Sequence, residues 1–189
     1  MNNKIQIHPS LCIGICVSFF LLPIPWLFSW IIAALMHEVG HIVALKSLQI
    51  PIHRITADIK GTYIETGFLT PCAEFVCALA GPLSGLVCFL VFLKLFPLLA
   101  VCGLVQSLYN LLPYPNYDGG RILSVVLNRF LSAKAALFAY RGITICSTAV
   151  LLFLGLYFWL VLKLGLIALI ICMIPVLKTG IIKIPCKRR

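Results

Sequence analysis

Long apolar runs make up most of the chain, and short polar or proline-rich breaks separate them. A helix needs about 20 mostly apolar residues to cross the hydrocarbon core of a bilayer. The runs therefore predict about six membrane-spanning helices, of which the first is short and begins as early as Pro9. The predicted spans are residues 12–22, 26–48, 70–95, 97–112, 142–162 and 165–177. This pattern predicts an all-α polytopic membrane protein.

Two stretches between the spans have a different pattern. Residues 50–66 mix isoleucines with polar residues around Lys60 and Gly61, which favours two short strands joined by a turn. We therefore expect a small β-hairpin between the second and third spans. Residues 113–120 contain prolines, glycines, an asparagine and an aspartate, so a helix must unwind there. Residues 122–131 are typical of a short helix at the membrane interface.

Composition supports the membrane assignment. Of the 189 residues, 62% are hydrophobic and 11% are charged, whereas soluble domains are about half apolar and about a quarter charged. The net charge of +10 does not indicate nucleic-acid binding, because the basic residues are scattered at the ends of the spans and are not interleaved with aromatic residues. The nine cysteines contain no C-x-x-C pair, so we expect buried thiols and no disulfide framework.

The basic residues also predict how the spans are oriented. If the amino terminus is cytoplasmic and six segments cross, only Lys94 and Lys163 of the 15 lysines and arginines face the outside. Cytoplasmic loops carry the excess of Lys and Arg in membrane proteins. We therefore expect a multi-pass protein of the cell membrane with both termini in the cytoplasm.

The second predicted span contains the motif His37-Glu38-Val39-Gly40-His41. Charged side chains at membrane depth are costly and usually functional. Residues four apart lie on one face of a helix, so His37 and His41 can reach one metal ion. Glu38 lies beside them, where it can take a proton from the attacking water. The short motif also occurs by chance, but chance is a weaker explanation inside a hydrophobic span.

A hydrolytic zinc site usually has three protein ligands and one open position. Three other acidic residues lie near interfaces and are ordinary solvated carboxylates there: Asp58, Glu65 and Glu74. Asp118 differs, because it lies in the unwound segment after the fourth span. Irregular backbone at membrane depth is tolerated where it is buried in protein or lines a wet cavity. The alternative is that Asp118 caps a helix that begins near Arg121.

Three motifs together resemble the site-2 protease family of intramembrane zinc metalloproteases. They are the His37 to His41 motif, Gly81-Pro82 in the third span, and Asn110-x-x-Pro113-x-x-x-x-Asp118-Gly119 after the fourth. In that family both histidines and the aspartate bind zinc, and the glutamate activates water. The resemblance implies one zinc ion per chain, with His37, His41 and Asp118 as its ligands and Glu38 as the general base.

The amino-terminal segment 4–9, the short first span and the hairpin are similar to the stage-IV sporulation protein FB type. Its members release a membrane-tethered sigma-factor precursor. The resemblance implies a zinc metalloendopeptidase that cuts in or beside a transmembrane segment of a single-span or membrane-associated protein. Such proteins usually add a nucleotide-sensing CBS domain after the last span. The sequence shows none there, so we expect control from outside, by an inhibitory membrane partner.

We expect one transmembrane domain over residues 1–189, with a catalytic core at about 26–131, a closing helix pair at about 142–177 and a basic cytoplasmic tail at 178–189. Asn110 either orients the substrate or makes a helix-to-helix hydrogen bond. The remaining site positions are expected to be structural. Gly81 and Pro82 allow close packing of the third span, and Pro113 unwinds the helix. Gly119 allows the turn that orients Asp118. His8 is either a fourth ligand or, with better reason, a solvated interface histidine.

Two other classes of function compete with proteolysis. A metal-ion or proton transporter also places His and Asp at membrane depth, although the chain has no detectable repeat and Glu38 serves hydrolysis better than transit. A catalytically silent membrane partner that holds a client would not need His37, Glu38, His41 and Asp118 together.

Overall fold

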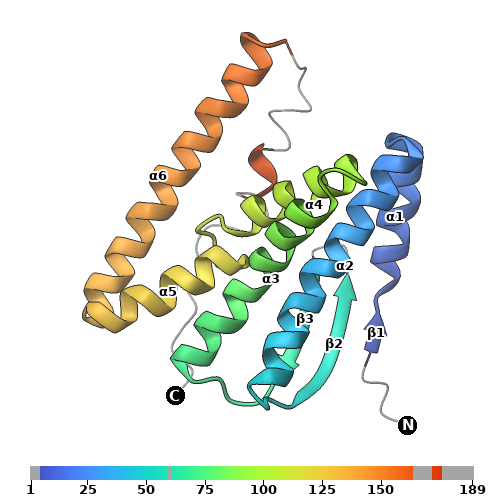
Figure 1. Ribbon diagram of the computed structural model, residues 1–189. Coiled ribbons are helices and arrows are strands. Elements are labelled where there is room, and N and C mark those ends of the chain that lie inside the picture. Colours follow the sequence, from blue (N-terminus) through green and yellow to red (C-terminus); the bar gives the residue numbers. More distant parts are fainter. Residues whose placement is uncertain (1–4, 59–60, 164–171, 176–189) are drawn as a thin grey trace. The chain divides into compact units, whose positions relative to one another are not determined.

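The computed structural model of the protein describes residues 5–58, 61–163 and 172–175 (Figure 1). The described chain forms two compact units, Met1–Asn110 and Leu111–Arg189. The first unit holds β1, α1, α2, β2, β3, α3 and α4, and the second holds α5 and α6. Most of the predicted last span at 165–177, the whole tail at 178–189 and the predicted turn residue Lys60 lie outside the described residues.

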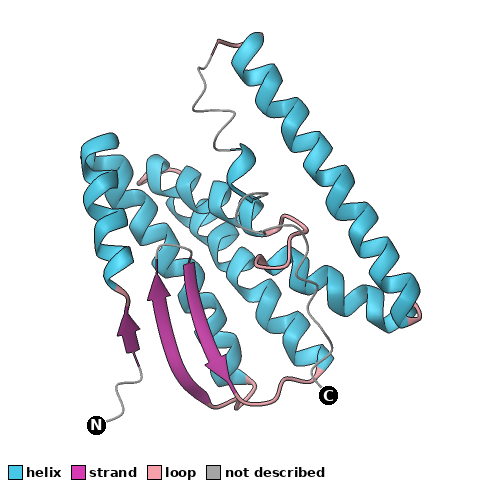
Figure 2. Ribbon diagram, turned by 180° about the vertical axis from the view of Figure 1, so that it is seen from behind, coloured by secondary structure: helices cyan, strands magenta, loops and turns pink. Residues whose placement is uncertain are grey.

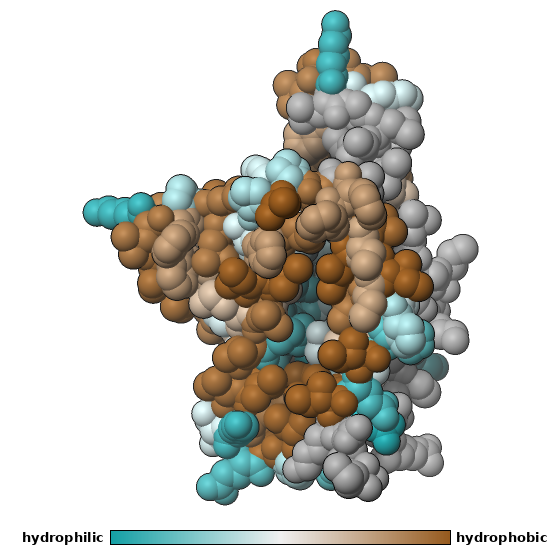
Figure 3. Space-filling view, turned by 90° about the vertical axis from the view of Figure 1, so that its right-hand side faces the viewer, coloured by the Kyte–Doolittle hydropathy of each residue, from teal (hydrophilic) through white to brown (hydrophobic). Residues whose placement is uncertain are grey.

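Three of the described helices are long and apolar enough to cross a membrane. They are α2 (Ile24–Ser47), α3 (Pro71–Phe92) and α6 (Ala133–Leu160). Two more apolar helices are shorter, α1 (Pro9–Leu21) and α4 (Pro97–Asn110). Large apolar side chains are exposed along the long helices, and hydrophobic residues dominate the surface in Figure 3. Such a surface suits lipid and not water.

The helices begin where the sequence provides a cap or a proline. Pro9 and Pro71 stand in the first turns of α1 and α3, where a missing N–H costs nothing. Thr70 caps α3, because its hydroxyl oxygen accepts a hydrogen bond from Ala73 N at 3.3 Å. His8 caps α1 in the same way, accepting from Ser10 N through Nδ1 at 3.3 Å. His8 is exposed, which agrees with an interface histidine and not with a buried ligand.

The start of α6 differs from our prediction of a span at 142–162. The helix begins at Ala133, after Ser132, whose hydroxyl accepts from Ala135 N at 3.4 Å. The alanine-rich segment after this cap has high helix propensity. Gly142 is exposed with open space around it, so nothing ends the helix there. α6 therefore begins well before Gly142, the residue at which the sequence predicts the span to start.

A three-stranded sheet accompanies the helices of the first unit, in the order β1 (Ile5–Ile7), β2 (Ile52–Asp58), β3 (Gly61–Thr66) (Figure 2). The antiparallel pair β2 and β3 confirms the predicted hairpin between the helices α2 and α3. Gly61 has φ 136° at the turn, and its N–H donates to Asp58 Oδ1 at 3.1 Å. β1 pairs in parallel with β2 and was missed, because three residues give no readable alternation.

Small residues bring α2 and α3 into close contact in the first unit. A side chain at Gly40 would lie 2.6 Å from the carbonyl oxygen of Ala80, so the two backbones nearly touch. The Ser84 hydroxyl donates across this contact to the carbonyl oxygen of Met36 at 2.9 Å. This close packing fixes the face of α3 that lies against the histidine motif.

α4 packs on the same pair of helices. The buried Gln106 side chain donates from Nε2 to the carbonyl oxygen of Trp30 on α2, at 3.0 Å. A side chain at Gly85 of α3 would overlap Ser107 Oγ and lie 2.8 Å from the carbonyl oxygen of Gly103, both on α4. Within the first unit, α2, α3 and α4 therefore form a tight three-helix arrangement with small residues at its contacts.

In the second unit, α5 (Asp118–Phe130) is preceded by an irregular segment at 111–117. This segment is held to α6 by hydrogen bonds. Tyr114 is fully buried, and its hydroxyl lies 2.9 Å from Thr148 Oγ1. The Thr144 hydroxyl donates to the carbonyl oxygen of Pro113 at 3.1 Å. The unwound turn predicted around Pro113 is confirmed, and its geometry is fixed within this unit.

Candidate metal centre

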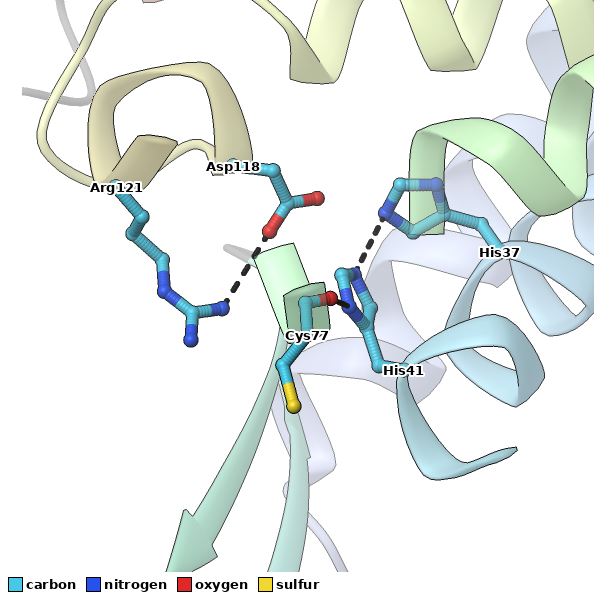
Figure 4. Close-up of polar contacts among 5 residues, drawn as sticks. All are labelled: His37, His41, Cys77, Asp118 and Arg121. Atoms are coloured by element: carbon cyan, nitrogen blue, oxygen red, sulfur yellow. Dashed lines mark hydrogen bonds and ion pairs between the residues drawn. The ribbon is translucent and has the colours of Figure 1, made fainter. Parts of the chain in front are cut away.

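His37 and His41 lie on one face of α2 and point into the first unit (Figure 4). They are 5% and 8% exposed, so both imidazoles are taken out of solvent. Their Nε2 atoms are 3.1 Å apart, and the rings meet edge to face. Two nitrogen ligands of one tetrahedral zinc ion are roughly 3.3 Å apart when each Zn–N distance is about 2.0–2.1 Å. The pair therefore converges at a separation that fits one shared ion.

The orientation of His41 is set from α3. Its Nδ1 lies 2.7 Å from the main-chain carbonyl oxygen of Cys77 (Figure 4). A carbonyl oxygen only accepts, so Nδ1 must carry the proton and donate it. Nε2 then keeps its lone pair, which is the form in which a histidine binds a metal ion. The role of Cys77 could not be predicted, because a main-chain carbonyl has no signature in the sequence.

Glu38 is the next residue after His37 on α2. Its side chain is partly exposed, whereas both histidines are buried. Glu38 therefore follows His37 directly on α2 without being buried with the two histidines.

Asp118 is the first residue of α5 in the second unit and is 7% exposed. Arg121 Nη1 lies 3.5 Å from its Oδ1, which gives the carboxylate a cationic neighbour (Figure 4). The N-cap of α5 is Tyr117 and not Asp118, so the capping alternative is wrong. A carboxylate in the first turn of a helix is nevertheless stabilised by the helix dipole.

The glycine after Asp118 has a different role from the one predicted. A side chain at Gly119 would overlap the carbonyl oxygen of Leu111 and lie 2.7 Å from that of Leu112. Its backbone does not adopt a positive φ, so Gly119 is needed for close approach and not for a sharp turn. The carboxylate is thus presented by a helix start that lies directly against the unwound segment.

Three further positions that the sequence predicts for the site lie on α3 and α4. Gly81 and Pro82 are buried in α3, and Pro82 lies inside the helix. Asn110 is the last residue of α4 and is half-buried. No contact described for Asn110 distinguishes a substrate-binding role from a helix-to-helix hydrogen bond. Both interpretations therefore stay predictions.

The chemistry of the donor set fits a metal ion. His37, His41 and Asp118 are all buried and each offers one ligand atom, two imidazole nitrogens and a carboxylate oxygen, so they could hold a metal ion. Zinc takes these donor types, with three protein ligands in catalytic sites. Fold and donor set together define a helical membrane protein with a candidate metal centre.

Comparison with known proteins adds one similarity of fold. No family model matches the chain, and no curated protein matches it. Among solved structures, the fold is similar to that of Site-2 Protease from Methanocaldococcus jannaschii, with a TM-score of 0.64. The two chains are 19% identical, and the match covers 95% of this chain and 92% of that chain. The likeness extends over nearly the whole of both chains.

Proposed function

We propose that the protein is an intramembrane zinc metalloprotease that hydrolyses a peptide bond in or beside a transmembrane segment of its substrate. The observation that carries the proposal is the convergence of the His37 and His41 Nε2 atoms, with the His41 tautomer set by the Cys77 carbonyl. The fold shared with a site-2 protease supports the same activity. Two histidines buried in an apolar helix are costly to place there, so such a pair usually belongs to a functional site.

Asp118 is the third ligand in this proposal. Three observations support this: Asp118 is buried, the Arg121 guanidinium lies beside it, and it belongs to the motif Asn110 to Gly119. Two histidines alone leave a zinc ion short of the three protein ligands that a catalytic site has. A third donor is therefore needed, and Asp118 has the chemistry to supply it.

His37, His41 and Asp118 would hold the zinc ion, which would supply Lewis acidity to polarise the scissile carbonyl and to lower the pKa of a water molecule to about 7. Glu38 takes the proton of the attacking water on its carboxylate. It then delivers that proton to the nitrogen of the leaving amine. A general acid–base group contributes about 10²–10⁴-fold to a rate.

The substrate we propose is a single-span or membrane-associated protein. A helix hides its backbone carbonyls, so the cleaved stretch must first become extended. β2 lies between β1 and β3 in the sheet, and β3 is the hairpin strand with an outer edge. An extended substrate could add to that edge as a further strand. Asn110 would then orient the substrate backbone near the site.

The finer topology and biology are also proposals. The distribution of lysine and arginine supports six crossings with both termini in the cytoplasm. The short first helix and the hairpin support a relationship to the stage-IV sporulation protein FB type, with a sigma-factor precursor as substrate. An inhibitory membrane partner would then control cleavage.

The test is co-expression with candidate single-span precursors, comparing the wild type with Glu38→Gln. We expect the wild type to produce a shortened product, and Glu38→Gln to bind zinc normally but cleave about 10²–10⁴-fold more slowly. Wild-type cleavage retained in Glu38→Gln would contradict the proposal. If the protein is instead a metal-ion or proton transporter, ion transport through the histidines and Asp118 should survive the Glu38→Gln change.

A further inference from the structure

Gly81 lies on α3 one turn after Cys77 and faces the two histidines of α2. It is buried, and a Cβ added there would overlap His41 Nε2 and lie 2.7 Å from His37 Nε2. The three atoms nearest to this Cβ all belong to the two imidazole rings. The space that Gly81 leaves open is therefore the space on which both ligand nitrogens converge.

Two neighbouring glycines show what an ordinary packing glycine looks like in this unit. A Cβ at Gly40 would lie 2.6 Å from the carbonyl oxygen of Ala80, and one at Gly85 would lie 2.8 Å from that of Gly103. Each of these Cβ atoms would meet a backbone carbonyl oxygen of another helix together with a serine side chain, Ser84 at Gly40 and Ser107 at Gly85. At Gly81 the three nearest atoms all belong to imidazole rings, so the close approach of α3 to α2 at this position falls on the two candidate ligands.

The imidazoles cannot give way without losing their arrangement. The His41 ring is held by its Nδ1 hydrogen bond to the Cys77 carbonyl oxygen at 2.7 Å, one turn away on the same helix as Gly81. A metal ion lies about 2.0–2.1 Å from each nitrogen that binds it. A methyl group at position 81 would occupy part of that shell and push the two rings apart.

We propose that Gly81 is a positioning residue of the metal centre, and that its missing side chain leaves the coordination space in which His37 and His41 meet one ion. The part of this proposal that concerns the ion rests on the proposed function. The steric part concerns residues of the first unit alone.

The first experiment measures metal binding by the full chain purified in detergent. Zinc content is determined by elemental analysis, and Co²⁺ binding is followed by its visible absorption. We expect Gly81→Ala to bind both ions about 10–100-fold more weakly than the wild type, or not at all. Gly85→Ala is the matched control on the same helix: it should lower the temperature of thermal unfolding but keep the wild-type metal affinity.

The second experiment separates a metal-centre glycine from a packing glycine without any metal. Gly81→Ala is introduced into the wild type and into a chain that also carries His37→Ala and His41→Ala, and thermal unfolding is measured in the presence of a chelator. If only the imidazoles oppose a side chain at position 81, the change lowers the unfolding temperature of the wild type but not that of the histidine-free chain. Alanine is the better helix former, so no loss is expected there.

Two results would overturn the proposal. One is wild-type affinity for Zn²⁺ and Co²⁺ in Gly81→Ala. The other is an equal drop in unfolding temperature in both backgrounds, which would make Gly81 a packing glycine. A wild-type protein that binds neither ion would contradict the proposed function instead, and the unfolding comparison would still decide the steric claim.

Discussion

At the scale of single residues, the metal centre depends on hydrogen bonding as much as on ligand identity. The Cys77 carbonyl oxygen fixes the proton of His41 on Nδ1, which leaves Nε2 facing His37 Nε2 at 3.1 Å. Neither nitrogen needs to reorient to meet an ion, so little conformational entropy is lost on binding. This preorganisation is the physical reason to expect tight and specific metal binding.

The four histidines of the chain should therefore differ sharply in their effect on metal affinity. We predict that His37→Ala weakens zinc binding by more than about 100-fold, because losing a ligand costs more than losing a supporting hydrogen bond. His8→Ala is the matched control, since His8 is exposed and caps α1. It should leave zinc content unchanged, as measured by elemental analysis of both purified variants. Zinc lost from His8→Ala would revive the interpretation of His8 as a fourth ligand.

The sequence could predict the histidine pair but not its surroundings. A spacing of four residues places His37 and His41 on one face of any helix, so their joint action needs no tertiary information. The Cys77 carbonyl and the space at Gly81 depend on how closely α3 docks on α2. Small residues allow this close packing, and the sequence does not show which residues of the neighbouring helix they contact. Only three-dimensional structure reveals such positions.

At the scale of elements, patterns of hydrophobicity predicted helices better than their boundaries. The hairpin was predicted, because its alternation spans two strands of six or seven residues. β1 was not, because its three residues have no pattern outside their pairing with β2. Asp118 was expected within the unwound segment 113–120, whereas it is the first residue of α5. Local capping and loop contacts decide such boundaries, and hydropathy does not record them.

The hairpin provides a prediction at this scale. Replacing residues 52–66 with a short flexible linker should abolish cleavage of a co-expressed substrate, because the edge of β3 is lost. Zinc content should not change, since the histidines and the Cys77 carbonyl belong to α2 and α3. Cleavage and metal content are measured on the same preparation. Unchanged turnover would reject the strand-addition role, and lost zinc would show that the hairpin supports the metal centre itself.

At the scale of the whole molecule, the two compact units have different tasks in the proposed enzyme. The first unit positions the histidines and Glu38 on α2, and the second fixes Asp118 at the start of α5. A likeness in fold that covers 95% of the chain at 19% identity shows that this arrangement of elements tolerates extensive sequence change.

The six-crossing topology is tested by the location of the termini. We predict that reporters fused to either end of the chain are active only on the cytoplasmic side, because the excess of lysine and arginine marks that side. A reporter exposed on the outer face at one end would require an odd number of crossings. The histidine pair on α2 would be unaffected by that result, since the contact between His37 and His41 lies within the first unit.

The central proposal is that Asp118 is a ligand of the ion that His37 and His41 bind. Its most direct test is the zinc affinity of the purified full chain with Asp118→Asn, which keeps the size of the side chain and removes its charge. We predict about one tightly bound zinc ion per wild-type chain and an affinity more than about 100-fold lower in Asp118→Asn. Wild-type affinity in Asp118→Asn would show that Asp118 is not a ligand and that the two histidines bind metal without the second unit.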